Sequence, residues 1–204
     1  MKALVFKEIG KIELEDIPIP EVNNPDDVLI KVTACGICGS DVKILQGKHA
    51  YKPNTVLGHE LNGTVEEVGA QVRSLKAGDR VAIDNNPRCG LCDFCRTGFS
   101  SQCEWIKEKT IGIFKNGGYA EYCVAPESVC YKLPEDLDYL IATQVETLGT
   151  VLNGMNTVQM QPWDMVVVLG CGPIGYLFTS FAQNIAAQVA VTEIDRFRIG
   201  VAKK

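Results

Sequence analysis

Four cysteines in one short stretch constrain the fold of this chain more than any other feature. They are spaced as Cys89-x2-Cys92-x2-Cys95-x7-Cys103. Two residues between thiols allow a tight turn that directs both sulfurs at one ion, and the longer loop lets the fourth sulfur complete a tetrahedron. Two disulfides or four unrelated buried thiols are the alternatives. The spacing favours a closed four-thiolate zinc site, which by itself predicts stability rather than chemistry.

The composition is that of a globular protein that lacks the charge expected for nucleic-acid or anionic-membrane binding. The 204 residues are 46% hydrophobic and 22% charged, with a formal net charge of -5. The run 1–7 is too short for a signal-peptide core, and no apolar run reaches ~18 residues, so we expect no membrane span. The cysteines outside the quartet are scattered, which favours the reducing cytoplasm. They are Cys35, Cys38, Cys123, Cys130 and Cys171.

Short strand-like patterns dominate the first two thirds of the chain. They cover 28–34, 63–69, 78–83 and 117–124, with turn residues at their ends. Many short strands at this spacing predict an irregular barrel or sandwich. After Pro134 the pattern becomes helical.

Two helices are expected in this later segment. Asp136 is predicted to cap one that runs toward Ala142 and Val145, and a second helical pattern covers about 148–159. Pro162 is expected to end it.

A strand–loop–helix–strand pattern occupies the end of the chain. The near-continuous apolar run 165–169 predicts a strand buried on both faces. It leads into a glycine loop at 170–175, an apolar helix to about 186, a strand at 188–193 and a basic helix near Arg196. This order predicts one right-handed βαβ unit.

The glycine loop has the sequence context of a dinucleotide-binding fingerprint. Gly170 permits the tight turn, Gly172 lets the backbone approach a pyrophosphate, and Gly175 allows close packing of helix on strand. Pro173 and Ile174 open the helix, whose N-terminal N–H groups would face the phosphates. A glycine-rich turn without a ligand is the alternative.

An acidic residue follows the second strand of this unit. Glu193 is placed to accept hydrogen bonds from an adenosine ribose, and its charge would repel a 2′-phosphate, which favours NAD over NADP. Arg196 and Arg198 weaken that preference, because either could reach a phosphate. We assign Arg198 to the predicted cofactor site.

A second constellation suits an open metal site. It combines Cys35-x2-Cys38 with His59 and Glu60 from a separate segment. A catalytic zinc takes three protein ligands of these types and keeps a position for water or substrate. Spacing alone leaves alternatives: a redox pair for the two cysteines, and a surface histidine for His59.

Five motifs in order resemble the zinc-dependent medium-chain alcohol dehydrogenase family. They are 36–41 (Gly-Ile-Cys-Gly-Ser-Asp), 58–60 (Gly-His-Glu), the cysteine quartet, 117–122 (Gly-Gly-Tyr-Ala-Glu-Tyr) and 170–175. The resemblance covers essentially the whole chain. It implies an α/β protein with a β-rich N-terminal part: a GroES-like catalytic domain over 1–150, then the first βαβ part of a Rossmann domain over 151–204, incomplete in this chain.

The resemblance also implies two zinc ions per chain. The quartet would hold a structural zinc, and Cys38 and His59 would ligate the catalytic one, with Glu60 as a direct or exchangeable ligand. The polyol and threonine dehydrogenase branches place a glutamate in Glu-Pro-Leu at the remaining position. Here Glu146 stands there, but Thr147 replaces the proline. We expect Glu146 to be the third ligand or the partner of zinc-bound water; a helix-surface carboxylate is the alternative.

By this resemblance the chemistry is NAD(P)-dependent oxidation of a secondary, polyol-like alcohol to a ketone. Ser40 is the expected first proton acceptor, with a plain turn-forming serine as the alternative. Relatives often continue the proton relay with a histidine where this chain has Lys43, and a lysine of ordinary pKa, about 10.4, is protonated at pH 7. Three options remain: burial lowers the pKa of this lysine, the proton leaves through Glu60 and water, or Lys43 contacts an anionic ligand.

The remaining expectations concern the whole protein. The substrate is a small alcohol or ketone, and a longer protein would form a homo-oligomer, a dimer or tetramer. Residues 1–204 alone would hold zinc but bind NAD poorly. A non-catalytic zinc-stabilised fragment and a zinc-independent reductase of the same superfamily are the competing functions.

Overall fold

Two compact units make up the chain, and the computed structural model describes residues 1–203 of it. The first unit covers Met1–Glu146, and the second begins at Thr147. No helix within the described residues is long and apolar enough to cross a membrane.

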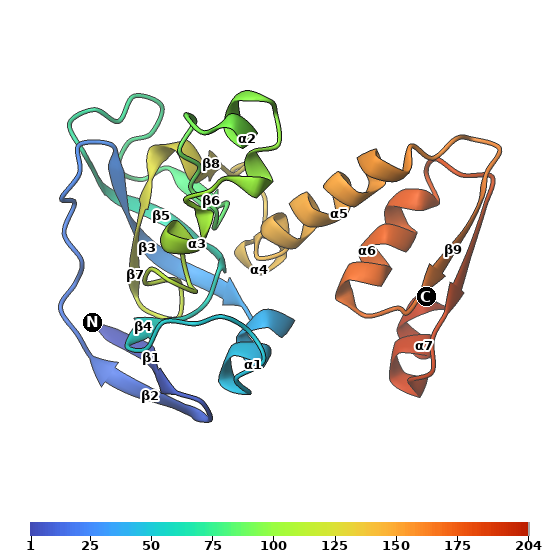
Figure 1. Cartoon of the computed structure of the whole chain (residues 1–204), viewed down its shortest axis with the longest axis horizontal. Coiled ribbons are helices and arrows are strands. Elements are labelled where there is room, and N and C mark those ends of the chain that lie inside the picture. Colours follow the sequence, from blue (N-terminus) through green and yellow to red (C-terminus); the bar gives the residue numbers. More distant parts are fainter. Residues whose placement is uncertain (204) are drawn as a thin grey trace. The chain divides into compact units, whose positions relative to one another are not determined.

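The first unit is built on short antiparallel strands, as the sequence predicts (Figure 1). A five-stranded sheet has the order β7-β3-β5-β6-β8, and a three-stranded sheet the order β2-β1-β4. The strands are β1 (Lys2–Glu8), β2 (Lys11–Asp16), β3 (Asp27–Gly36), β4 (Thr55–Val56), β5 (Glu60–Val68), β6 (Arg80–Ile83), β7 (Tyr122–Pro126) and β8 (Cys130–Lys132).

Short helices fill the connections of this unit. They are α1 (Gly39–Leu45), α2 (Asp93–Arg96), η1 (Ser100–Gln102), α3 (Ile106–Lys109), η2 (Glu127–Val129) and α4 (Tyr139–Ala142). The longer α5 (Val145–Val158) begins at the end of this unit and continues into the second.

Apolar side chains on one face of the larger sheet form the main core. Val28 and Ile30 of β3, Leu61 and Val65 of β5, and Val81 of β6 are almost completely buried. Their alternation along each strand places them on one face, because successive side chains of a strand point to opposite sides. A second cluster, around Phe6, Ile44, Leu57 and Ile113, packs α1 against the smaller sheet.

Two of the scattered cysteines belong to this core. Cys123 and Cys130 are buried with the apolar cluster, and burial raises the pKa of each thiol to about 12. They therefore act as small apolar side chains.

The helical segment after Pro134 differs in detail from the prediction. Asp138, not Asp136, caps α4: its Oδ1 accepts from Leu140 N at 2.6 Å and Ile141 N at 3.4 Å. Asp138 has the extended backbone that a capping residue needs, whereas Asp136 lies within a turn. The helix also stops at Ala142, and α5 starts at Val145, earlier than the expected 148.

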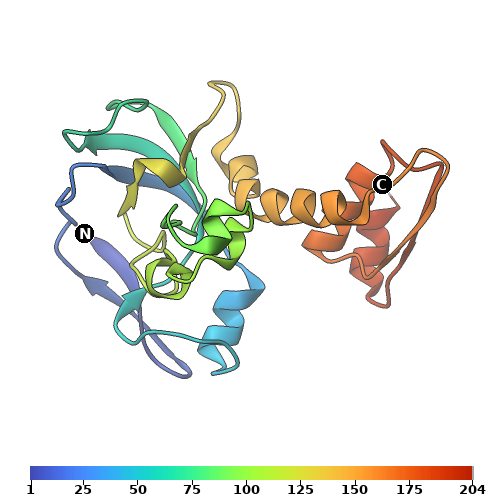
Figure 2. The ribbon, with the colours of Figure 1, turned by 45° about the horizontal axis from the view of Figure 1, so that its top comes forward.

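The second unit contains the expected βαβ order (Figure 2). β9 (Met165–Leu169) pairs in parallel with β10 (Gln188–Thr192), α6 (Pro173–Ala182) packs against both strands, and α7 (Arg196–Ala202) follows.

The expectation that β9 is buried on both faces is wrong for the described residues. Met165, Val167 and Leu169 are 69%, 54% and 82% exposed, whereas Val166 and Val168 are partly covered. Within this unit α6 packs on one face of the strand pair. A continuous apolar run shows that both faces of a strand are able to be buried. Which faces are buried depends on the helices or sheets that pack against it.

We predict that Ile30→Ala lowers the free energy of unfolding of the zinc-loaded chain by about 2–5 kcal/mol, because it leaves a cavity in the main core. Urea denaturation followed by circular dichroism measures this change. Leu14→Ala, at a β2 position that is 66% exposed, is the control and should change the value by less than about 0.5 kcal/mol. Equal effects of the two substitutions would contradict the assigned core.

Candidate metal centres and nucleotide loop

The pairing of β3 with β5 creates one of the candidate centres. Gly36, the last residue of β3, lies opposite Glu60, the first residue of β5. Cys38 follows β3 by two positions, and His59 immediately precedes β5. Because the strands are antiparallel, the end of one lies beside the start of the other, so both residues reach the same end of the sheet.

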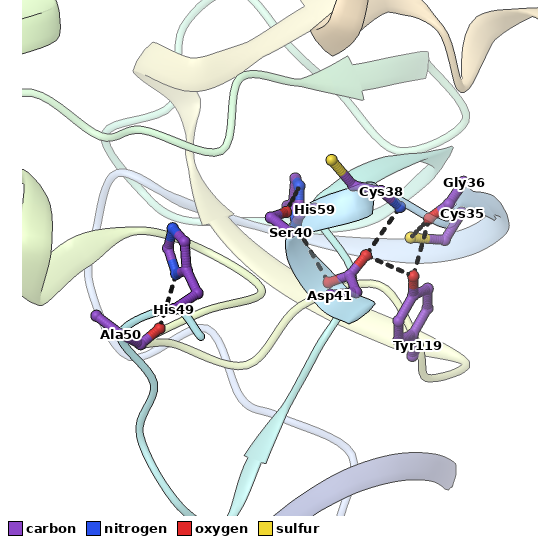
Figure 3. A network of polar contacts seen from close by, with 9 residues as sticks. All are labelled: Cys35, Gly36, Cys38, Ser40, Asp41, His49, Ala50, His59 and Tyr119. Carbon is purple, nitrogen blue, oxygen red and sulfur yellow. Dashed lines mark hydrogen bonds and ion pairs between the residues drawn. The ribbon is translucent and has the colours of Figure 1, made fainter. Parts of the chain in front are cut away.

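Cys38 also begins helix α1. Its backbone is extended, and its N–H donates to Asp41 Oδ2 at 2.9 Å. This bond closes the first turn of the helix and holds the Cys38–Asp41 segment in a fixed conformation. Figure 3 shows the Cys38 sulfur and the His59 ring on one side of this turn and the Tyr119 ring on the other.

His59 is buried and has a neighbour at each ring nitrogen. Nε2 lies 3.1 Å from Ser40 Oγ, and Nδ1 lies 3.5 Å from Asp41 Oδ1. Burial opposes a charged ring, but Asp41 and Cys38 outweigh it and raise the pKa of His59 to about 10. His59 in turn lowers the pKa of the Cys38 thiol, so this pair favours thiolate.

Two glutamates lie near this candidate centre. Glu60 is buried, and an ideal Cβ on Gly36 would lie 2.2 Å from its Oε2, so a side chain at position 36 would displace the Glu60 carboxylate. Burial raises the pKa of Glu146, and His59, Glu60 and Asp84 are the charged groups that act on it. Glu146 therefore lies within electrostatic range of His59, at the start of α5.

The donor set of this centre fits a divalent zinc ion. A thiol of lowered pKa at Cys38, an imidazole at His59 and carboxylates at Glu60 and Glu146 share one region, with the buried Asp41 carboxylate facing the second ring nitrogen of His59. Burial of several negative groups is unfavourable without compensating charge. The protonated His59 ring supplies one positive charge, and a dication bound in place of that proton would supply two. The candidate ligand atoms of this centre lie farther apart than those of the quartet. Among residues 1–203, only the quartet has three or more ligand atoms that all lie within 4.8 Å of one another.

The quartet is the second centre, and it fits zinc more closely. Four sulfurs about 2.3 Å from a tetrahedral zinc lie roughly 3.8 Å apart. Cys89 Sγ and Cys95 Sγ are 3.9 Å apart, and all four sulfurs lie within 4.8 Å of one another. The alternatives of disulfides and scattered thiols do not apply, since all four cysteines are free and adjacent.

Backbone N–H groups stabilise the thiolate form at two sulfurs of the quartet, Cys89 and Cys103, whereas desolvation raises the pKa of Cys95 to about 12. Cys92 N and Leu91 N donate to Cys89 Sγ at 3.3 and 3.4 Å, and these bonds lower the pKa of Cys89. Cys89 N donates to Cys103 Sγ at 3.4 Å and lowers the pKa of that thiol. Such bonds stabilise a sulfur that carries negative charge, the form that binds metal.

The predicted relay residue Lys43 lies apart from these contacts. Its side chain is exposed on α1, so the option that required its burial has no support. Ser40, by contrast, is half-buried and next to His59.

The sequence reasoning assigned no role to Asp41 or Tyr119. Asp41 is buried and contacts Cys38, His59 and Tyr119, whose hydroxyl donates to Asp41 Oδ2 at 2.8 Å. An acid three residues after a candidate ligand at a helix start is a capping signal that would have placed Asp41 here. The contact with Tyr119 joins distant segments and has no local signal.

The glycine loop of the second unit has the predicted conformation. Gly170 has a φ of 93°, which requires glycine, and an ideal Cβ on Gly175 would lie 2.0 Å from Gly170 O. At Gly172 the nearest atom to such a Cβ is Arg198 Nη1, at 3.7 Å, so the chain itself leaves room there. Pro173 is the first residue of α6, and Ile174 follows it.

Glu193 joins this loop to the end of β10. Its Oε2 accepts from Cys171 N at 2.9 Å, and its Oε1 accepts from Ile194 N and Asp195 N at 2.7 and 3.0 Å. These N–H groups lower the pKa of Glu193, and Arg198 Nη1 lies 3.9 Å away. The predicted cofactor residues of this unit are thus adjacent.

A separate cavity of about 630 Å³ lies elsewhere in the first unit. Basic side chains (Arg88, Lys109 and Lys115) and acidic ones (Asp26 and Asp27) both line it. None of the site residues predicted from the sequence lines it, and its mixed charges select no single ligand class.

Comparison with known proteins identifies the family. Residues 24–135 match the alcohol dehydrogenase GroES-like domain, and the chain belongs to this family. It is 37% identical to D-xylulose reductase A of Aspergillus niger, over 99% of this chain and 58% of that protein. The predicted fold class, a GroES-like domain followed by Rossmann-type βαβ structure, is confirmed.

Solved structures agree with this assignment. The fold superposes with a TM-score of 0.94 on a structure described as a zinc-binding dehydrogenase from Sinorhizobium meliloti bound to NADP, at 34% identity, covering 99% of this chain and 58% of that one. Galactitol-1-phosphate dehydrogenase from Escherichia coli gives 0.92 at 31% identity, with 100% and 58% covered. The chain thus spans 58% of the length of these relatives.

We predict that Cys103→Ser removes one zinc ion per chain, because a neutral hydroxyl is a much poorer zinc ligand than a thiolate. Atomic absorption after gel filtration measures the metal content. Cys130→Ala, which removes a thiol from the apolar core, should leave the content unchanged. Full zinc retention by Cys103→Ser would argue against the quartet as a metal site.

Proposed function

We propose that this chain is the zinc-binding part of an oxidoreductase that transfers hydride between a polyol-like secondary alcohol and NAD(P), giving a ketone. One observation carries the proposal: the β3–β5 pairing brings Cys38 and His59 together, with Ser40 Oγ 3.1 Å from His59 Nε2. In a chain of this family, that combination suits an alcohol held and deprotonated beside a metal.

Zinc ligation falls to Cys38, His59 and Glu146, with Glu60 as a direct or exchangeable ligand. Zinc bound there would act as a Lewis acid that lowers the pKa of an alcohol hydroxyl. The chain's own part is preorganisation: Asp41 faces His59 Nδ1, which leaves Nε2 for the side where Cys38 and Ser40 lie. The quartet then supports the lobe between β6 and β7 and takes no part in the reaction.

Proton transfer begins at Ser40 in this proposal. Its Oγ adjoins the candidate metal ligand His59 and is half-buried, so it can accept a proton from an alcohol while its own hydroxyl proton passes to solvent water. Lys43 is exposed one turn further along α1 and suits contact with an anionic group or solvent rather than the first acceptance of the proton.

Cofactor binding is proposed for the glycine loop and Glu193. NAD bound there would supply the hydride acceptor. The room at Gly172 suits a pyrophosphate, and the N-terminus of α6 offers free N–H groups. Glu193 favours NAD over NADP, while Arg198 beside it is the group that could tolerate a 2′-phosphate.

The D-xylulose reductase and galactitol-1-phosphate dehydrogenase relatives support a polyol–ketose pair as substrate. A homo-oligomer and a cytoplasmic location complete the proposal. The location is supported by nine cysteines that are all free.

We predict that Cys38→Ala lowers kcat/KM for polyol oxidation by at least about 100-fold, because loss of the metal removes several kcal/mol of transition-state stabilisation. NADH formation is followed with xylitol, sorbitol and galactitol 1-phosphate, on this chain and on any longer product of its gene. Cys35→Ala is the matched control and should retain activity, whereas a redox pair would need both thiols. Activity that survives Cys38→Ala would favour a zinc-independent reductase.

We predict that Glu193→Gln narrows the preference for NAD over NADP by about tenfold, since it removes the charge that repels the 2′-phosphate. Fluorescence titration with NADH and NADPH measures both affinities. Gln188→Ala, at the opposite end of β10, is the control. An unchanged ratio of affinities would show that Glu193 does not select the cofactor.

A further inference from the structure

We propose that Tyr119 is a positioning residue that sets the zinc affinity of the Cys38–His59 centre by holding Asp41. This inference rests on the proposed function, because it assumes zinc at that centre. It assigns a role to the hydroxyl of Tyr119, which comes from a segment 60 positions after His59 in the sequence.

The Tyr119 hydroxyl contacts both ends of the 36–41 segment, which carries the candidate ligand Cys38. It is 2.8 Å from Asp41 Oδ2 and 3.1 Å from Gly36 O. A phenol has one proton, and the carboxylate is the closer and the charged acceptor, so the proton goes to Asp41. Figure 3 shows this bond beside the one from Cys38 N to the same oxygen.

Asp41 Oδ2 thus receives two hydrogen bonds, which fix the direction of the whole carboxylate. Its other oxygen, Oδ1, points to His59 Nδ1 at 3.5 Å, and neither of these two buried atoms has a hydrogen-bond partner among the described residues. A small rotation of the carboxylate therefore decides whether Nδ1 obtains an acceptor. Without the phenol, only Cys38 N restrains that rotation through Oδ2.

The ring of Tyr119 contacts the other side of the centre. An ideal Cβ on Gly58 would lie 2.6 Å from Tyr119 Cδ1, so the ring rests directly on the residue before His59. Tyr119 N donates to Leu57 O at 2.9 Å, which anchors the same segment. The backbone and the ring together hold Tyr119 against residues 57–59, which lead into β5. The hydroxyl is therefore kept at a fixed distance from Asp41.

The function of this arrangement follows from general metal chemistry. A histidine ligand that donates its second N–H to a carboxylate is oriented and made more basic, and loss of such support typically costs 10–100-fold in metal affinity. Tyr119→Phe removes only the hydroxyl and keeps the ring on Gly58. We expect it to weaken zinc binding at this centre by about tenfold and to leave the quartet unchanged.

The test is a chelator competition on the full chain, with zinc content measured at each chelator concentration. Two zinc ions per chain should be released in two steps, and Cys38→Ala identifies the step that belongs to the Cys38–His59 centre. Tyr119→Phe should shift that step alone. Tyr131→Phe, which removes a hydroxyl from an exposed tyrosine, is the matched control.

A double-substitution cycle separates positioning from a general structural effect. In an Asp41→Asn background, Tyr119→Phe should have little further effect, because its proposed action passes through the carboxylate. An undiminished effect there, or an equal shift of both release steps, would overturn the proposal. So would a Tyr119→Phe chain that releases zinc like the wild type.

The two hypotheses fail in different ways. If the wild-type chain holds only the quartet zinc, the proposed metal centre itself is wrong. If the wild type holds two and Tyr119→Phe matches it, the centre stands and the role of Tyr119 is refuted.

Discussion

The antiparallel pairing of β3 with β5 is the constraint on which the first unit depends. It aligns the apolar residues of both strands on one face of the sheet, where they form the core. It also places Gly36 opposite Glu60, so that the segments entering and leaving the two strands meet. The same ladder of hydrogen bonds thus supplies stability and the location of the candidate metal centre. A shift in register would displace both together.

The two candidate metal centres differ in how they are built. The quartet comes from one loop, whose short spacings and backbone N–H groups shape it locally. The Cys38–His59 centre is assembled from β3, β5, α1 and the start of α5, and its ligand atoms are less closely gathered. A closed site of local origin suits a structural role. A site assembled from separate elements can leave a coordination position open for a substrate.

Sequence reasoning succeeded where the chemistry is local. The quartet, the glycine loop and the short strands are each encoded within a few residues, by thiol spacing, by positions that require glycine and by alternating polarity. It was less accurate for the exact start of a helix, which depends on backbone conformation, and for the burial of a strand, which depends on the layers packed against it. Asp138 rather than Asp136 caps α4, and β9 is exposed on one face in the described residues because α6 packs on the other.

By itself the sequence determined the family motifs, the residue types able to bind zinc and a dinucleotide, and the order of the secondary-structure elements. Only the tertiary structure decided which of those residues meet. It shows how strand pairing brings Cys38 and His59, which the family resemblance had already grouped, to one end of the sheet. It also added Asp41 and Tyr119, whose hydrogen bond spans 78 positions along the chain. The physical reason is that hydrogen-bond networks around a buried charge depend on direction and distance between segments. The spacing of residues in the sequence predicts these directions and distances only within a single turn, helix or strand.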